Sequence, residues 1–187
     1  FLTPNGLDID AYRFTDKPKY SERSICIGKI EDRKKQFFLQ RINSLWFAGN
    51  IADNRFNQDK NYLGEIPKSE IKTNLTDYGN LVLISDGEVH PRVCTEALAA
   101  GLGIVISECG IANLDLSKPF ITVIPDSKIN DIKYIETQII MNRDYSNSHR
   151  HDILEYARQF DWDNILEKYY FPSINKIRSD YVPSITK

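Results

Sequence analysis

The sequence predicts an α/β fold in which a doubly wound parallel sheet of about six strands is followed by C-terminal helices. Three observations lead to this fold class. Short apolar runs are continuous rather than alternating in polarity, which is typical of strands that are buried on both faces. Stretches with helical periodicity separate these runs. After Asp126, only helical patterns remain.

Six apolar runs are the candidate strands. They cover residues 24–28, 45–49, 61–64, 80–85, 103–107 and 120–125. In a doubly wound sheet, ligands bind in the crevice beyond the carboxyl ends of the strands. A binding site is therefore expected in the loops that follow Gly28, Gly49, Gly64, Ser85 and Ser107.

Helical patterns fill the segments between and after the strands. The first four cover residues 34–42, 68–75, 91–100 and 132–141. The third is the clearest, because Pro91 suits the first helical position and Gly101 suits the residue that ends a helix. Two further apolar stripes with helical spacing cover residues 153–160 and 162–169, and Pro172 punctuates the tail.

The composition excludes several classes of protein. The 187 residues carry a formal net charge of −2 and 41% are apolar, which excludes extended disorder and gives no support to broad electrostatic binding of nucleic acid. No apolar run approaches the ~20 residues that span a bilayer. Three cysteines are too few for a disulfide framework, and their odd number favours a reducing compartment. The chain begins with Phe1 and no signal-peptide pattern follows, so we expect a segment of a longer chain.

Two glutamates flank the start of the clearest helix. Glu88 precedes this helix and Glu96 lies in its second turn, so the two carboxylates approach one cleft from different elements. Backbone N–H groups at the helix start, including those of Arg92 and Val93, suit a phosphate together with the helix dipole. The two oxygens of Glu96 suit the two hydroxyls of a ribose. The alternative is that both glutamates are solvated charges or salt-bridge partners on the helix.

The loop after the first run is basic. Gly28 permits a tight turn, and Lys29 and Lys34 can face the same crevice and neutralise a diphosphate. The alternative is a surface charge run that begins a helix.

Other kinds of site find little support in the sequence. His90 and Cys94 are four residues apart, but Pro91 begins the helix between them and no second ligand pair is near, so we expect no metal site. The chain has no Gly-x-Ser-x-Gly, Gly-x-Gly-x-x-Gly or Walker motif, so hydrolase, dinucleotide-binding and P-loop functions are unsupported.

Four motifs follow one another along the chain. They are Pro4-Asn5-Gly6-Leu7-Asp8 with Phe14; Gly28-Lys29 through Lys34; Ser85-x-x-Glu88-x-x-Pro91-x-x-x-x-Glu96-Ala97; and Phe160-Asp161-Trp162-Asp163. In this order they resemble motifs of the retaining glycosyltransferases with the GT-B fold, family 4. The third is similar to the E-x7-E motif of that family, and the resemblance covers about residues 1–172.

The resemblance implies a Rossmann-like domain over residues 1–172, one half of a GT-B fold, that binds a nucleoside diphosphate sugar. It implies that Lys29 and Lys34 contact the diphosphate, that Glu88 holds hydroxyls of the sugar and that Glu96 binds the ribose. Further implied donor contacts come from Gly28, from residues near the base, Gly64 and Ile66, and from the backbone of Val89, His90, Pro91, Arg92 and Val93.

The implied reaction moves a glycosyl group to an unknown acceptor with retention of configuration, without a cofactor and usually without a bound metal. The implied partner is an N-terminal acceptor domain of the same protein, which the tail over residues 173–187 would contact, so the isolated domain is expected to be inactive alone. The expected compartment is the cytoplasm, and peripheral membrane contact in this family usually involves the other domain.

Several positions depart from the family pattern. Lys29 stands where Arg is usual, Val89 where Gly is usual and Gly103 where Pro is usual. The exchange at position 29 loses a bidentate grip on phosphate. These departures motivate one alternative, a nucleotide-sugar-binding module without transfer activity. A second alternative is another GT-B enzyme, such as a nucleotide-sugar epimerase.

Overall fold

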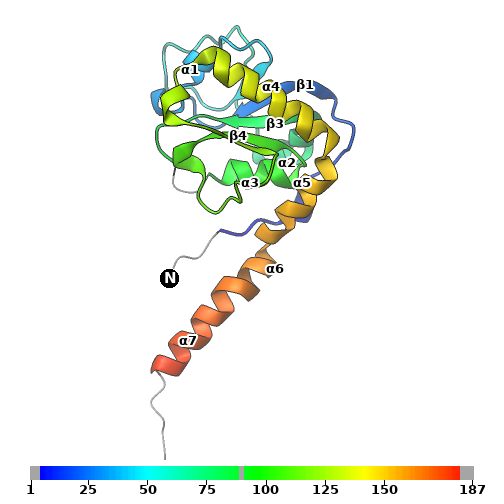
Figure 1. The fold of residues 1–187 in the computed structure, drawn as a ribbon, viewed down its shortest axis with the longest axis vertical. Helices are drawn as coiled ribbons and strands as arrows, with labels where there is room; N and C mark the ends of the chain where they lie inside the picture. Colours follow the sequence, from blue (N-terminus) through cyan, green and yellow to red (C-terminus); the bar gives the residue numbers. More distant parts are fainter. Residues whose placement is uncertain (1–4, 89–90, 182–187) are drawn as a thin grey trace, which may run out of the picture.

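Five parallel strands form one sheet in the part of the chain that the structure, a computed structural model, describes: residues 5–88 and 91–181 (Figure 1). The strands are β1 (Tyr20–Ile27), β2 (Leu45–Ala48), β3 (Tyr78–Leu83), β4 (Gly103–Ser107) and β5 (Ile121–Ile124). They lie in the order β2-β1-β3-β4-β5, and every neighbouring pair is parallel. The winding reverses between β1 and β3, so the carboxyl ends of these strands border the crevice in which such sheets bind ligands.

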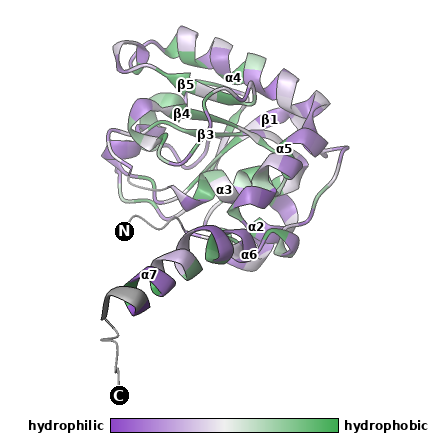
Figure 2. Ribbon diagram, turned by 60° about the horizontal axis from the view of Figure 1, so that its bottom comes forward, coloured by the Kyte–Doolittle hydropathy of each residue, from purple (hydrophilic) through white to green (hydrophobic). Residues whose placement is uncertain are grey.

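Helices cover both faces of the sheet. On one face lie α2 (Lys68–Asn74), α3 (Arg92–Ala99) and α5 (Arg150–Ala157), and on the other lie α1 (Gln36–Leu39) and α4 (Ile132–Ser148). Neighbouring strand residues alternate between two apolar clusters, with Leu81 in one and Val82 in the other. Figure 2 shows the hydrophobic strands enclosed by helices of mixed character. The prediction of a doubly wound α/β sheet is therefore confirmed.

The expected third strand, residues 61–64, is not a strand of this sheet. It runs beside β2 and exchanges backbone hydrogen bonds with Phe47, but it pairs only through an isolated bridge at Tyr62. Asn61 has a φ of 53° and Gly64 a φ of 80°, which leaves only two extended residues between them. The described sheet thus has five strands rather than about six.

The helix α3 packs closely on the sheet. Ala97 and Ala100 are fully buried, and the small side chains allow a close approach. Gly101 follows with a φ of +77° and ends the helix, as the sequence predicts. Pro91 is the N-cap residue rather than the first helical residue, because its ψ of 98° is extended.

The last helices form one rod that points away from the sheet (Figure 1). The rod contains α6 (Trp162–Ile165), a π-helical turn (Leu166–Tyr170) and α7 (Phe171–Tyr181). Pro172 lies inside the rod, although the sequence predicts a break there. Since proline has no N–H to donate and clashes with the preceding turn of an α-helix, the wider π turn before it lets the helix continue. The division into residues 1–172 and 173–187 falls within α7 and stays a prediction.

Two of the sequence motifs meet although they are far apart in the chain. The Leu7 N–H donates to the Phe160 carbonyl at 2.8 Å, and the Trp162 N–H donates to the Leu7 carbonyl at 3.2 Å. A Cβ at Gly6 would lie 2.4 Å from the Trp162 ring, so only glycine fits there. Among the described residues, no helix combines the length and the apolar character needed to span a membrane.

Candidate functional site

Loops from three neighbouring strands meet at the carboxyl edge of the sheet. The loop after β3 is fastened to β4, because the Ser107 hydroxyl donates to the Ser85 carbonyl at 2.8 Å and accepts from the Ser85 N–H at 3.0 Å. The Cys109 thiol donates to the same carbonyl at 3.0 Å. The loop after β1 joins them through the Asp86 N–H, which donates to the Arg33 carbonyl at 2.9 Å.

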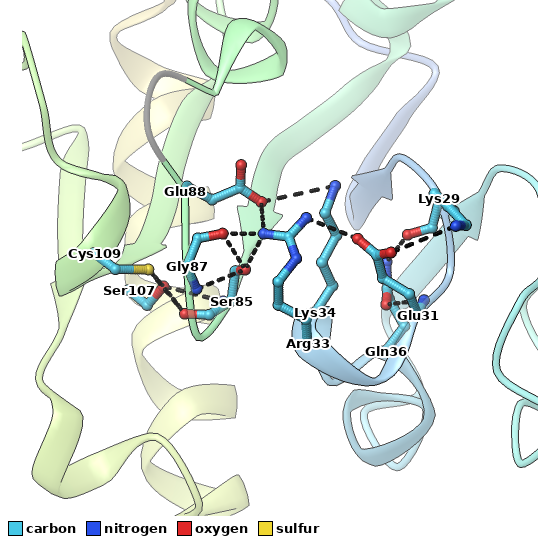
Figure 3. A network of polar contacts seen from close by, with 10 residues as sticks. All are labelled: Lys29, Glu31, Arg33, Lys34, Gln36, Ser85, Gly87, Glu88, Ser107 and Cys109. Atoms are coloured by element: carbon cyan, nitrogen blue, oxygen red, sulfur yellow. Dashed lines mark hydrogen bonds and ion pairs between the residues drawn. The ribbon is translucent and has the colours of Figure 1, made fainter.

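Glu88 and Lys34, which lie in two of the loops where the sequence predicts a binding site, come together at this edge (Figure 3). Lys34 Nζ lies 3.7 Å from Glu88 Oε1, and both side chains are only 14% exposed. Gly28 provides the space for Lys34, because a Cβ at Gly28 would lie 3.0 Å from Nζ. A mostly buried cation and a mostly buried carboxylate thus face each other at the switch point of the sheet.

Lys29 lies elsewhere in the same loop. Its Nζ is 3.7 Å from a carboxylate oxygen of Glu31, and its side chain is 58% exposed. In Figure 3, Glu31 stands between Lys29 and the group around Glu88. The Gln36 side chain fixes the loop backbone, since its amide donates to the Lys29 carbonyl at 3.0 Å and its oxygen accepts from the Glu31 N–H at 3.2 Å.

Arg33 is a residue of this site that the sequence analysis does not include. Its guanidinium contacts Glu88 Oε1 and Ser85 Oγ at 3.0 Å each, the Gly87 carbonyl, and Glu31 Oε1 at 2.7 Å. These contacts raise the pKa of Arg33, through the hydrogen bond with Glu31 first and the bond with Glu88 next. Arg33 in turn holds the pKa of Glu31 below its usual value.

The helix α3 carries the second glutamate, Glu96, and follows the loop that holds Glu88. Among the described residues, no side chain makes a capping hydrogen bond at the N-terminal end of the helix. Arg92 is exposed, whereas Val93 and Glu96 are half-buried. Burial and the nearby Glu96 carboxylate raise the pKa of Tyr12, which packs beside α3. Val89 and His90 lie outside the described residues.

A hollow of about 200 Å³ lies at the ends of β1 and β2. Its lining includes Gly28, Lys29 and Ile66, three residues that the sequence analysis selects. Asn50 and Glu65 also line it, and the Asn50 side-chain amide donates to Glu65 Oε1 at 2.7 Å. Gly64, whose φ is +80°, turns the chain into this loop. A larger hollow of about 680 Å³ lies between Asn113 and the π-helical turn and contains none of the predicted site residues.

The described residues contain no group of three or more His, Cys, Asp and Glu side chains that could hold a metal ion. Cys26 and Cys94 are buried, and burial raises the pKa of the Cys26 thiol to about 12.

Comparisons with known proteins give a likeness in structure and none in sequence. No family model and no curated protein sequence matches this chain. The structure is similar to that of sucrose-phosphate synthase from Thermosynechococcus elongatus, with a TM-score of 0.72, 14% identity, and coverage of 96% of this chain and 53% of that chain. The fold is Rossmann-like and corresponds to one half of a GT-B fold.

Two other solved structures agree with this fold. HepE from Anabaena in complex with UDP-glucose has a TM-score of 0.70 and 14% identity, over 94% of this chain and 57% of that chain. WaaG, a glycosyltransferase involved in lipopolysaccharide biosynthesis, has a TM-score of 0.62 and 13% identity, over 90% of this chain and 54% of that chain. The chain thus spans about half the length of these structures.

Proposed function

We propose that this chain is the donor-binding half of a retaining GT-B glycosyltransferase of family 4. One observation carries the proposal: Lys34 and Glu88, from the loops after β1 and β3, face each other at the switch point of the sheet. A cation and a carboxylate side by side at the sheet edge suit a ligand that carries both a diphosphate and a hydroxylated sugar. The likeness to a complex with UDP-glucose supports this ligand class.

Each part of the ligand has a matching element. Lys34 and the backbone start of α3 suit the diphosphate, because both present positive charge or unpaired N–H groups. Glu88 suits sugar hydroxyls, and Glu96 on α3 suits the ribose, since carboxylates accept hydrogen bonds from paired hydroxyls. The hollow beside Ile66 and Gly64 then receives the base.

The same residues favour the chemical step. Breaking the anomeric bond leaves extra negative charge on the departing nucleoside diphosphate. Lys34 is a fixed cation in a partly desolvated place, where its effect on developing charge is larger than in water. Glu88 meanwhile holds the sugar in one orientation, which is the positioning contribution to the rate.

The acceptor belongs to the other half of the enzyme in this proposal. The chain spans about half of the similar structures, and its C-terminal rod exposes Phe171, Ile174 and Ile177 on a helix that points away from the sheet. We propose a cytoplasmic enzyme whose acceptor domain meets this rod. The isolated donor half then binds nucleotide without transferring sugar.

Nucleotide binding tests the proposal. UDP, GDP and ADP are titrated into the chain while its thermal unfolding is followed. A nucleotide at 100 times its Kd should stabilise the fold by about 2.7 kcal/mol. Lys34→Ala should abolish most of this gain, whereas Lys133→Ala, on the exposed side of α4, should keep it. If none of the three nucleotides stabilises the chain, the proposal is wrong.

Retention is tested on the whole protein. The anomeric configuration of the sugar in the product, determined by NMR with a nucleotide sugar as donor, should match that of the donor. An inverted product would refute the retaining assignment while leaving donor binding intact.

A further inference from the structure

We propose that Arg33 is the second diphosphate-binding cation of this site, in place of Lys29, and that binding of the diphosphate transfers Arg33 from Glu88 to the phosphate. The inference rests on the proposed function and names a residue that the family motif does not include. Its starting point is that two cations converge on one carboxylate, with Arg33 Nη1 at 3.0 Å and Lys34 Nζ at 3.7 Å from Glu88 Oε1.

The positions of the three candidate cations distinguish them. Arg33 and Lys34 both contact Glu88, which is 14% exposed. Among the described residues, the Lys29 ammonium pairs with Glu31 alone, and its side chain is 58% exposed. In Figure 3, Arg33 lies beside Lys34, whereas Lys29 lies on the far side of Glu31. A phosphate group that reaches Lys34 therefore meets Arg33 before it meets Lys29.

The chemistry of Arg33 suits the task. A guanidinium is planar and donates two parallel hydrogen bonds to a phosphate, a grip that an ammonium group cannot make. Arg33 already uses Nη1 on Glu88, Ser85 and Gly87 and Nη2 on Glu31, so its donors point into the group of loops rather than to solvent. Its remaining exposure of 42% leaves it accessible to a ligand.

The contacts also couple the two parts of the ligand. Both cations contact the same oxygen of Glu88, Oε1, so this oxygen is occupied before the ligand binds. A diphosphate competes for both cations and so frees the lone pairs of Glu88 for the sugar. The diphosphate should therefore strengthen sugar binding at Glu88 by adding Oε1 to the acceptors that face the sugar, which favours an activated sugar over the free sugar.

Titration calorimetry with UDP tests the assignment. Arg33→Ala should weaken UDP binding by about tenfold or more, the effect of losing a hydrogen bond to a charged group. Arg33→Gln, which keeps two donors without the charge, should also weaken it, and Lys29→Ala should weaken it less than Arg33→Ala does, because the Lys29 side chain is 58% exposed. The loss in Arg33→Ala should be smaller for UMP and absent for uridine.

Several outcomes overturn the assignment. They are unchanged UDP affinity in Arg33→Ala, a loss in Lys29→Ala that equals or exceeds it, and an equal loss for UDP and uridine. A remaining possibility is that Arg33 only neutralises Glu88 and does not bind the phosphate. In that case, Arg33→Ala introduced into a Glu88→Gln chain has no effect on UDP affinity, and the assignment is wrong. Thermal melting of each variant without ligand identifies any that fail to fold. If Arg33→Ala does not fold, the UDP affinity of Arg33→Gln decides the test.

The proposed function fails in a different way. If the unaltered chain binds none of UDP, GDP and ADP, then the function and the role of Arg33 are both wrong. If the unaltered chain and the Arg33 variants bind UDP equally well, then only the role of Arg33 is wrong.

Discussion

Replacing the buried Arg150 by alanine should destabilise the fold by about 4 kcal/mol. This arginine is 2% exposed and donates to four backbone carbonyl oxygens: those of Thr15 at 2.7 Å, Thr76 at 2.6 Å, Tyr78 at 3.1 Å and Ala100 at 3.1 Å. A buried carbonyl left without a donor costs about 1–3 kcal/mol. Water entering the vacated space would satisfy some of them, so we take about 1 kcal/mol for each.

Arg150 stays charged at neutral pH even though it is buried. Burial lowers its pKa to about 10, still well above 7. Lys in place of Arg keeps the charge but offers three donors from a single nitrogen, which cannot reach four separated carbonyls. Arg150→Lys should therefore lose about half as much stability as Arg150→Ala.

Urea denaturation followed by circular dichroism at pH 7 measures both losses. Arg158→Ala is the matched control. In the part of the chain that the structure describes, the exposed Arg158 guanidinium makes only long ion pairs, with Asp10 and Glu155, so this substitution should cost less than about 0.5 kcal/mol. A loss below about 1 kcal/mol in Arg150→Ala would refute the reasoning, since four orphaned carbonyls cannot cost so little. Ala100 is the C-cap residue of α3, and its carbonyl accepts from Arg150. The UDP affinity of Arg150→Ala therefore reports whether the position of α3 depends on this hydrogen bond.

Three more outcomes are expected. Glu96→Ala should weaken UDP binding by about 1.5–3 kcal/mol in a calorimetric titration, and an unchanged affinity would exclude Glu96 from the ribose contact. Gly49→Ala should cost about 2 kcal/mol or more in urea denaturation, because its Cβ would lie 2.0 Å from the Gly28 carbonyl oxygen at a φ of +144°, whereas Gly87→Ala, with open space around it, should cost far less. Asp131 caps α4, and the backbone N–H that it accepts lowers its pKa, so its contribution is complete above about pH 4 and is lost as the pH falls further. Asp131→Ala should therefore melt at a lower temperature than the unaltered chain at pH 7, and the difference should shrink as the pH falls below about 4. A difference that does not shrink in acid would contradict this.

The sheet could be predicted from the sequence because its strands are buried on both faces. Every residue of β3 and β4 is buried, and residues 81–83 and 104–106 within them are continuously apolar. The run over residues 61–64 has a similar composition but is interrupted by the left-handed backbone of Asn61 and Gly64. Such a conformation depends on local hydrogen bonds, here including the Asn61 amide that donates to the Asn43 carbonyl, and periodicity does not report it.

The site was predictable where spacing along the chain decides the position, and less so inside the basic loop. Glu88 and Lys34 meet because each follows a strand that ends at the same edge. Three consecutive cations at positions 33–35 look equivalent in the sequence. The 3-10 turn over Asp32–Lys34 and the left-handed Lys35, with a φ of 52°, send Arg33 and Lys34 to Glu88 and Lys35 to Asp86.

The pairing of Leu7 with the Phe160–Trp162 turn has a consequence for protein engineering. Everything between these points, including the whole sheet and all the proposed donor contacts, is a closed loop whose two ends lie within one hydrogen bond of each other. Such a unit can be inserted into a surface turn of an unrelated carrier protein without stretching either junction. New termini placed in an exposed loop, with the old ends joined by a short linker, should likewise leave the fold intact.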